Sequence, residues 1–195
     1  MKISGIILAA GASTRMTKYK QLLRFKGESL LNAIVDKCQQ LELNEIVCIT
    51  GYLDHELKAE AMNEDITFIH NTKHKEGMVG SLQLGINHVN ESSADAALVL
   101  LTDQPLIPLS HYQSMISTLV EHKAQLVATS YNKIIGVPAI YTRLYFQELM
   151  ALENNRSAKS VLKRHRDELV AIKCTEAGID VDTDEDYQNL LDQYE

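Results

Sequence analysis

The sequence predicts an α/β protein: a single domain with a mostly parallel sheet and helices on both faces. Short apolar runs rich in β-branched residues alternate along the chain with segments whose apolar residues recur at helical spacing. The connections between these segments are short, which is typical of a parallel sheet covered by helices. The chain has 195 residues, 45% of them hydrophobic, which is enough to bury a sizeable core. It contains no linker, internal repeat or low-complexity segment, so we expect one domain over residues 1–195.

The first half of the chain is predicted to alternate strictly between strand and helix. An apolar run at residues 3–8 suits a strand that is buried on both faces of the sheet. An amphipathic pattern then predicts a helix that begins near Ser29, and the next β-branched run ends at Gly51. After the first strand, the predicted elements are a helix from Ser29, a strand at 46–50, a helix at 55–62, a strand at 66–69 and a helix at 77–89.

The second half continues the alternation with one less regular section. The run at 96–101 is very apolar and stops before Pro105, because proline cannot continue a strand ladder. The less regular section follows residue 129 and contains Gly136 and Pro138. The predicted elements are strands at 96–101, 126–129, 139–141 and 169–172, and helices at 112–120, 143–152, 157–165 and from Asp184 onward.

The loop after the first strand has the composition of a phosphate-binding site. Residues 9–13 have almost no side-chain bulk, so their backbone N–H groups can approach a ligand closely. Arg15, Lys18 and Lys20 follow at once. A buried strand that opens into such a loop is how α/β proteins bind phosphate at the carboxyl edge of the sheet. The alternative is a plain strand-to-helix connection in which the basic residues stand by chance.

Charge and composition exclude several classes of function. The formal net charge of −7 argues against a general nucleic-acid binder. Every charged residue before Glu28 is basic, whereas residues 180–195 carry seven acids and no base, so we expect the basic segment to bind an anionic ligand. No apolar run is long enough to span a membrane and the N-terminus has no signal-peptide pattern, which predicts a cytoplasmic protein. Three scattered cysteines indicate core packing rather than a disulfide framework or a zinc site.

The loop also carries a resemblance to a known superfamily. Residues 8–20 read Leu-Ala-Ala-Gly-x-Ser-x-Arg-Met-x-x-x-Lys, which resembles the signature of the nucleotidyltransferases. Within them the chain is most similar to the molybdenum-cofactor nucleotidyltransferases, and particularly to the branch that transfers CMP. The resemblance implies a Rossmann-like fold and Mg²⁺-dependent transfer of CMP from CTP to the terminal phosphate of molybdopterin, with release of pyrophosphate. Thr17 stands where relatives usually have glycine, so the turn of this loop is expected to differ.

Two aspartates are the predicted metal ligands. Asp103 follows the strand at 96–101, so its carboxylate can hold Mg²⁺ at the same edge as Gly11. Leu-Thr-Asp-Gln-Pro around it resembles the family's metal-binding motif. Asp182 matches the second motif, although Asp184 stands where relatives have proline. The alternatives are a turn or cap role for Asp103 and, for the acids from Asp182 onward, a solvated acidic cap on the last helix.

The resemblance also implies the residues that bind the two substrates. Arg15 and Lys20 match the cations that hold the β- and γ-phosphates and therefore act in catalysis with Asp103. Ser81 is expected to contact the base, its alternative being a cap or solvent-facing residue. The full nucleotide-binding set is Leu8, Ala9, Ala10, Gly11, Ser13, Arg15, Lys20, Gly51, Asn71, Gly77 and Ser81.

Acceptor recognition is expected at Gly136 and Pro138, because Gly-Val-Pro-Ala resembles the Gly-x-Pro-Ala segment of the cytidylyl branch. That branch often has histidine at the position of Val137, and residues 154–159 depart from its Gly-Asp-x-Gly-Ala segment, so both differences affect acceptor identity.

Two other kinds of function compete with cytidylyl transfer. One is transfer of a different nucleotide or to a different acceptor, as in guanylyl- or sugar-phosphate nucleotidyltransferases. The other is a nucleotide-binding regulator or chaperone of a molybdoenzyme that has lost catalysis, against which the intact Lys20, Asp103 and Asp182 argue. The expected partners are a nucleoside triphosphate with CTP favoured, a molybdopterin-type acceptor and a molybdoenzyme or its chaperone, with no nucleic acid and no membrane.

Overall fold

The computed structural model describes residues 1–61, 65–154 and 156–194. Its central sheet has the strand order β5-β4-β1-β6-β8-β7-β9. These strands are β1 (Ile3–Leu8), β4 (Glu45–Thr50), β5 (Ile66–His70), β6 (Ala96–Leu101), β7 (Leu126–Tyr131), β8 (Ile134–Thr142) and β9 (Leu169–Lys173). Adjacent strands pair in parallel except for β8, which is antiparallel to both β6 and β7. The mostly parallel α/β sheet predicted from the sequence is confirmed.

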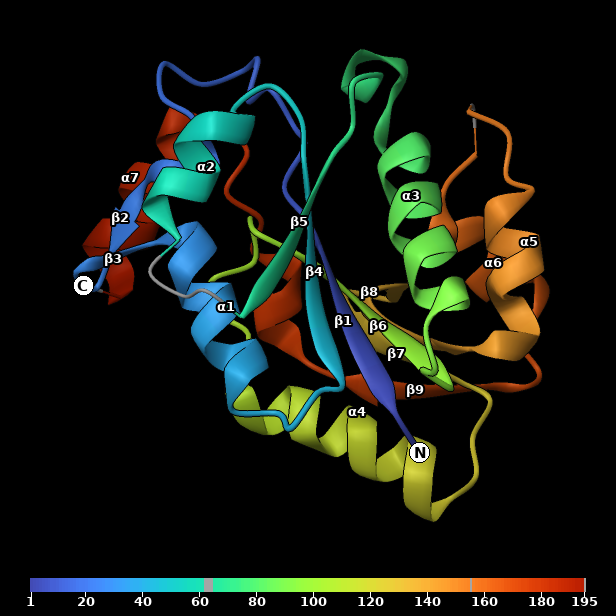
Figure 1. Cartoon of the computed structure of the whole chain (residues 1–195). Coiled ribbons are helices and arrows are strands. Elements are labelled where there is room, and N and C mark those ends of the chain that lie inside the picture. Colours follow the sequence, from blue (N-terminus) through green and yellow to red (C-terminus); the bar gives the residue numbers. More distant parts are fainter. Residues whose placement is uncertain (62–64, 155, 195) are drawn as a thin grey trace.

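Helices cover both faces of this sheet, as predicted (Figure 1). The α-helices are α1 (Leu30–Gln39), α2 (Asp54–Glu60), α3 (Met78–Glu91), α4 (Leu109–Glu121), α5 (Phe146–Met150), α6 (Ala158–Arg164) and α7 (Asp184–Tyr194). Short 3₁₀ helices occur at Lys20–Leu22, His74–Glu76, Arg143–Tyr145 and Thr175–Gly178. None of the helices in the described ranges is both long and apolar enough to cross a membrane.

Two apolar cores lie on opposite faces of the sheet because successive strand residues point to opposite sides. In β4, Ile46 and Cys48 pack in the core with α1 and α4, whereas Val47 and Ile49 pack in the core with α3, α5 and α6. The central strands are therefore largely apolar, as the sequence indicated, and their polar residues Ser4 and Thr50 are buried. The three cysteines are free and buried, and burial raises the pKa of each thiol.

A third, smaller core joins the two ends of the chain. The strands β2 (Arg24–Phe25) and β3 (Glu28–Ser29) form an antiparallel hairpin that the sequence analysis did not predict. Phe25 and Leu30 pack there with Val181 and with Leu190 of α7. The C-terminal helix consequently lies beside the N-terminal hairpin (Figure 1).

Several predicted boundaries differ from the structure. β8 spans nine residues rather than the three expected, because a register shift opposite Ala128 and Thr129 accommodates Pro138 within the strand. The helix expected at 143–152 is a 3₁₀ turn followed by the short α5. The helix expected at 55–62 ends at Glu60, and residue 62 lies outside the described residues. Helix α1 begins next to Ser29, as predicted, and the Ser29 side chain caps it by accepting a hydrogen bond from the Asn32 N–H.

Candidate active site

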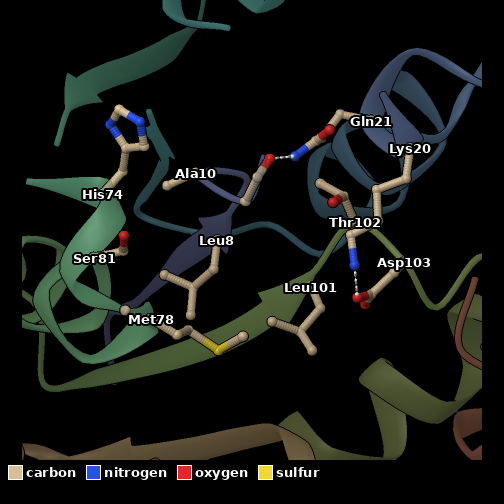
Figure 2. A pocket seen from close by; sticks show the side chains of 12 residues that line it. Leu8, Ala10, Lys20, Gln21, His74, Met78, Ser81, Leu101, Thr102 and Asp103 are labelled. Carbon is tan, nitrogen blue, oxygen red and sulfur yellow. Dashed lines mark hydrogen bonds and ion pairs between the residues drawn. The ribbon is translucent and has the colours of Figure 1, made fainter. Parts of the chain in front are cut away.

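A cavity of about 240 Å³ opens at the carboxyl ends of β1 and β6 (Figure 2). Lys20 and Gln21 lie on one side of it, and His74 and Ser81 lie on the other. Its lining consists of Leu8, Ala10, Gly11, Lys20, Gln21, His74, Gly77, Met78, Ser81, Leu101, Thr102 and Asp103. The cavity thus brings together both predicted motifs, the small-residue loop and the aspartate that follows β6.

The small-residue loop is held in place by a glutamine that the sequence analysis missed. Gln21 is 1% exposed, and its Nε2 donates hydrogen bonds to the carbonyls of Ala9 (3.0 Å) and Gly11 (2.7 Å). The Oγ of Ser13 accepts a hydrogen bond from the Lys20 N–H at 3.0 Å. Because Gln21 occupies two carbonyls of the loop, it fixes the backbone around the cavity. Its place next to Lys20 was the only signal in the sequence.

Thr17 was expected to change the turn of the loop, but in the structure it makes a contact with Asp184 instead. The left-handed residue of this loop is Ser13, with φ of 49°, and Thr17 is not among the residues with positive φ. Instead, the Thr17 N–H and hydroxyl both donate to the carboxylate of Asp184, at 3.1 to 3.2 Å. The two positions that depart from the family pattern are therefore hydrogen-bonded to each other.

Lys20 lies between the two predicted metal-binding aspartates. Its Nζ is 2.5 Å from Oδ2 of Asp103 and 3.0 Å from Oδ1 of Asp182, and Arg15 contacts the other oxygen of Asp182 at 2.8 Å. Burial alone would lower the pKa of Lys20, but the two carboxylates outweigh it and raise that pKa. Burial likewise opposes ionisation of Asp182, yet the Lys20 hydrogen bond and both cations lower its pKa. Lys20 and Asp182 are therefore both charged at neutral pH.

Asp103 has an oxygen that is free to bind a cation. Its Oδ1 is buried and has no hydrogen-bond partner among the described residues. No group of three or more histidine, cysteine or acidic side chains capable of holding a metal occurs in these residues. Mg²⁺ is commonly held by only one or two carboxylates together with substrate phosphates, so a site made of Asp103 and Asp182 fits this ion.

The acids near Asp182 have distinct roles. Asp180 accepts a hydrogen bond from Gln104 (3.0 Å), and burial together with the charge of Asp103 raises its pKa. Asp186 accepts from the N–H and hydroxyl of Thr183, whose Oγ1 accepts in turn from the Asp186 N–H. This reciprocal pair caps the start of α7, so the cap alternative holds for Asp186.

The predicted nucleoside-binding residues divide into two groups. Gly77 and Ser81 line the cavity; Gly77 has φ of 113° at the start of α3, a conformation that favours glycine. Ser81 is buried and accepts a hydrogen bond from Asn71 at 2.9 Å, which leaves the proton of its hydroxyl for another acceptor. Asn71 and Gly51 lie outside the lining. A Cβ on Gly51 would lie 2.6 Å from the Ala10 carbonyl, so this glycine allows close approach to the loop.

The predicted acceptor residues lie beside a second hollow rather than in the main cavity. This hollow, of about 80 Å³, shares Leu8, Met78 and Leu101 with the cavity and extends to Val137 and Ala158. Gly136 and Pro138 do not line either space. The Pro138 carbonyl accepts a hydrogen bond from Thr129 (2.8 Å), and Gly136 lies against the side chain of Lys159. Val137 is the residue of this segment that faces the hollow.

Comparison with known families decides the class of enzyme. Residues 5–169 match the model of the MobA-like NTP transferase domain. The chain belongs to this family. It is a nucleotidyltransferase, and the molybdenum-cofactor resemblance seen in the sequence is confirmed at the level of the family.

Individual relatives support this assignment. The chain is 23% identical to the molybdenum cofactor cytidylyltransferase of Escherichia coli K12, over 98% of this chain and 97% of that protein. It is 31% identical to the bifunctional protein GlmU of Bacillus cereus AH187, but spans only 30% of that longer protein.

Among solved structures, Rv0371c of Mycobacterium tuberculosis H37Rv has a TM-score of 0.85 at 25% identity, covering 98% of each chain. A manganese complex of Rv0371c, at 24% identity, has a TM-score of 0.76 over 99% of this chain and all of that chain. These similarities extend over nearly the whole chain, so they show that it has the same fold as Rv0371c.

Proposed function

We propose that this MobA-like enzyme transfers CMP from CTP to the terminal phosphate of molybdopterin, with Mg²⁺ and with release of pyrophosphate. The observation that carries the proposal is the contact of Lys20 with both Asp103 and Asp182 beside the small-residue loop. A cation and two carboxylates at one edge of the sheet are what transfer of a nucleotide from a triphosphate requires. The whole-length similarity to a molybdenum cofactor cytidylyltransferase supports the choice of acceptor.

Each group of residues in the site has a separate role in the proposed reaction. Ala10 and Gly11 line the cavity, where their backbone would bind the phosphates. Arg15 and Lys20, which contact the carboxylates in the structure, would then bind the leaving pyrophosphate. Before the triphosphate binds, contact with Asp103 and Asp182 raises the pKa of Lys20, so its ammonium is charged. Asp103 and Asp182 would hold Mg²⁺, which neutralises the triphosphate when bound. No general base is needed, because the attacking phosphate of the acceptor is already ionised.

The preference for CTP rests on the size and polarity of the cavity. Its volume of about 240 Å³ is small and suits a pyrimidine better than a purine. Ser81 keeps one hydrogen-bond donor for the base, and a polar group left unpaired by the wrong base costs roughly 1–3 kcal/mol.

A thermal-shift panel of CTP, GTP, ATP and UTP with Mg²⁺ tests the base preference. We expect CTP to raise the melting temperature most, because a ligand at 100 times its Kd stabilises the folded state by about 2.7 kcal/mol. The Ser81→Ala variant should narrow the difference between CTP and GTP. Equal stabilisation of the wild type by CTP and GTP would contradict cytidylyl specificity while leaving nucleotidyl transfer in place.

A further inference from the structure

A second pocket on the molecule is lined by cations and contains no acid. The cationic pocket is formed by Lys133, Ile135, Lys159, Leu162, Lys163 and Arg166, and its volume is about 250 Å³. It shares no lining residue with the nucleotide cavity. The four cations come from the turn between β7 and β8, from α6 and from the turn after α6. A concentration of positive charge in a chain of net charge −7 requires an explanation.

The four cations of this pocket have no carboxylate partner in the part of the chain that the structure describes. Arg164 and His165 lie between them in sequence, and both contact Glu148. The same segment therefore pairs Arg164 and His165 with Glu148 of α5 and leaves the cations that face the pocket without a carboxylate partner. Lys159 and Lys163 stand four residues apart on α6, where like charges repel each other. An anion in the pocket would relieve this repulsion.

The cationic pocket lies next to the segment expected to recognise the acceptor. Ile135 lines the pocket and Val137 lines the hollow beside the nucleotide cavity; they are two residues apart in β8, so their side chains share a face of the sheet, roughly 7 Å apart. Ala158 faces the hollow and Lys159 faces the pocket. A Cβ on Gly136 would lie 3.0 Å from Cε of Lys159, so the absence of a side chain there allows Lys159 to lie across the strand.

We propose that the cationic pocket binds a negatively charged group of the acceptor substrate, distinct from the phosphate that receives the nucleotide. This inference rests on the proposed function for the identity of the reaction, and it adds that the acceptor carries a second anionic group. Every polar residue in the pocket's lining is a cation, so the lining suits an anionic group. Ile135 and the buried Leu162 provide an apolar floor for the carbon skeleton next to that group.

A titration with inorganic phosphate, followed by ¹H–¹⁵N NMR, tests the anion site directly. We expect saturable shifts of the Ile135 and Leu162 amides, and a separate set of shifts around Lys20. In the double variant Lys159→Gln/Lys163→Gln, the shifts of the Ile135 and Leu162 amides should reach half of their maximum only at a phosphate concentration at least tenfold higher. The shifts around Lys20 should keep their phosphate dependence. Lys123→Gln, an exposed lysine between α4 and β7, is the matched control. If the shifts of the Ile135 and Leu162 amides are unchanged in the double variant, the cationic pocket is not an anion site.

Two further measurements distinguish binding of the acceptor from binding of an acidic protein segment. With molybdopterin as acceptor, the double variant should raise the acceptor KM at least tenfold and leave the CTP KM unchanged, whereas an unchanged acceptor KM would overturn the acceptor role. Hexaglutamate serves as a probe for binding of an acidic protein segment. If it binds the pocket tenfold more tightly than phosphate does, the acceptor role is overturned and the pocket binds an acidic protein segment instead. If the wild type transfers no nucleotide, the proposed function and the acceptor role fail together, while the phosphate titration still decides the anion site.

Discussion

At the scale of single residues, Lys20 connects the two parts of the site. Its ammonium contacts Asp103 and Asp182, so the cation predicted for the phosphates and the carboxylates predicted for the metal are paired in the unliganded protein. Burial opposes the charge on Lys20, and the carboxylates more than compensate for it. The lysine is therefore already charged and positioned when the triphosphate arrives.

We predict that Lys20→Ala lowers kcat/KM by roughly 10²–10³ and weakens binding of pyrophosphate, because the ammonium meets charge that grows on the leaving group. Initial rates of pyrophosphate release and a direct titration with pyrophosphate measure these effects. Lys18→Ala is the control, since Lys18 is exposed and lies outside the motif. A variant in which only the melting temperature changed would make Lys20 a structural residue.

Some site residues could be predicted from motifs, whereas others act through tertiary contacts that only the structure shows. Lys20 and Asp103 stand at fixed distances from recognisable strand ends, so their sequence context placed both at the carboxyl edge. Gln21 acts through its contacts with the Ala9 and Gly11 carbonyls, and neither spacing nor periodicity encodes such a contact. The acceptor contact of Gly136 stays a prediction, and the structure adds that the absence of a side chain there leaves room for Lys159.

At the scale of elements, the loop that follows β1 is attached to the C-terminal helix. Asp184 is the first residue of α7 and accepts hydrogen bonds from the N–H and hydroxyl of Thr17. The family pattern that this chain resembles would place glycine and proline at these two positions, and neither could form this side-chain contact. The two departures thus compensate each other: the loop loses the freedom of glycine and gains an anchor on α7.

We predict that Thr17→Ala and Asp184→Ala are coupled in a double-mutant cycle. Both side chains are exposed, so their coupling in urea unfolding should be small, on the order of 0.5 kcal/mol. Each single variant should raise the KM for CTP several-fold, because the loop that holds the phosphates loses its anchor. Glu185→Ala, the exposed neighbour, should leave both quantities unchanged. Strictly additive effects in the cycle would show that the contact does not position the loop.

The elements themselves were predictable where the pattern was long and regular. β1, β4 and β6 are mostly apolar runs, and α1 and α3 have clear helical periodicity. β8 was underestimated because Gly136 and Pro138 interrupt its pattern, and the bulge that tolerates them depends on pairing with β7. The β2–β3 hairpin has only two residues in each strand, which is too short for any alternation to show.

At the scale of the whole molecule, the two ends of the chain meet at the active site. The basic N-terminal segment and the acidic C-terminal segment are separated by more than 150 residues, yet Arg15 contacts Asp182 and Tyr187 donates a hydrogen bond to the Arg24 carbonyl. The sequence showed the opposite charges of the two segments, but not that they neutralise each other. That depends on the docking of α7 against the hairpin, which is a tertiary contact.

The meeting of the two ends explains how an acidic protein can present cations to a triphosphate. Without ligand, the largely buried Lys20 is held by Asp103 and Asp182, and the exposed Arg15 contacts Asp182. With Mg²⁺ and CTP, the carboxylates are predicted to bind the metal and the cations to bind the phosphates. Asp103 is the residue on which this exchange depends, because its Oδ2 holds Lys20 and its buried Oδ1 has no partner among the described residues.

Single-turnover release of pyrophosphate from CTP, with molybdopterin and Mg²⁺, compared between the wild type and Asp103→Asn, tests this account most directly. The amide keeps the shape of the side chain and removes its charge, so the fold and the melting temperature should be retained. We predict Mg²⁺-dependent release by the wild type and a loss of at least roughly 10³-fold in the variant. Near-wild-type release by Asp103→Asn would remove Asp103 from the site and contradict the account.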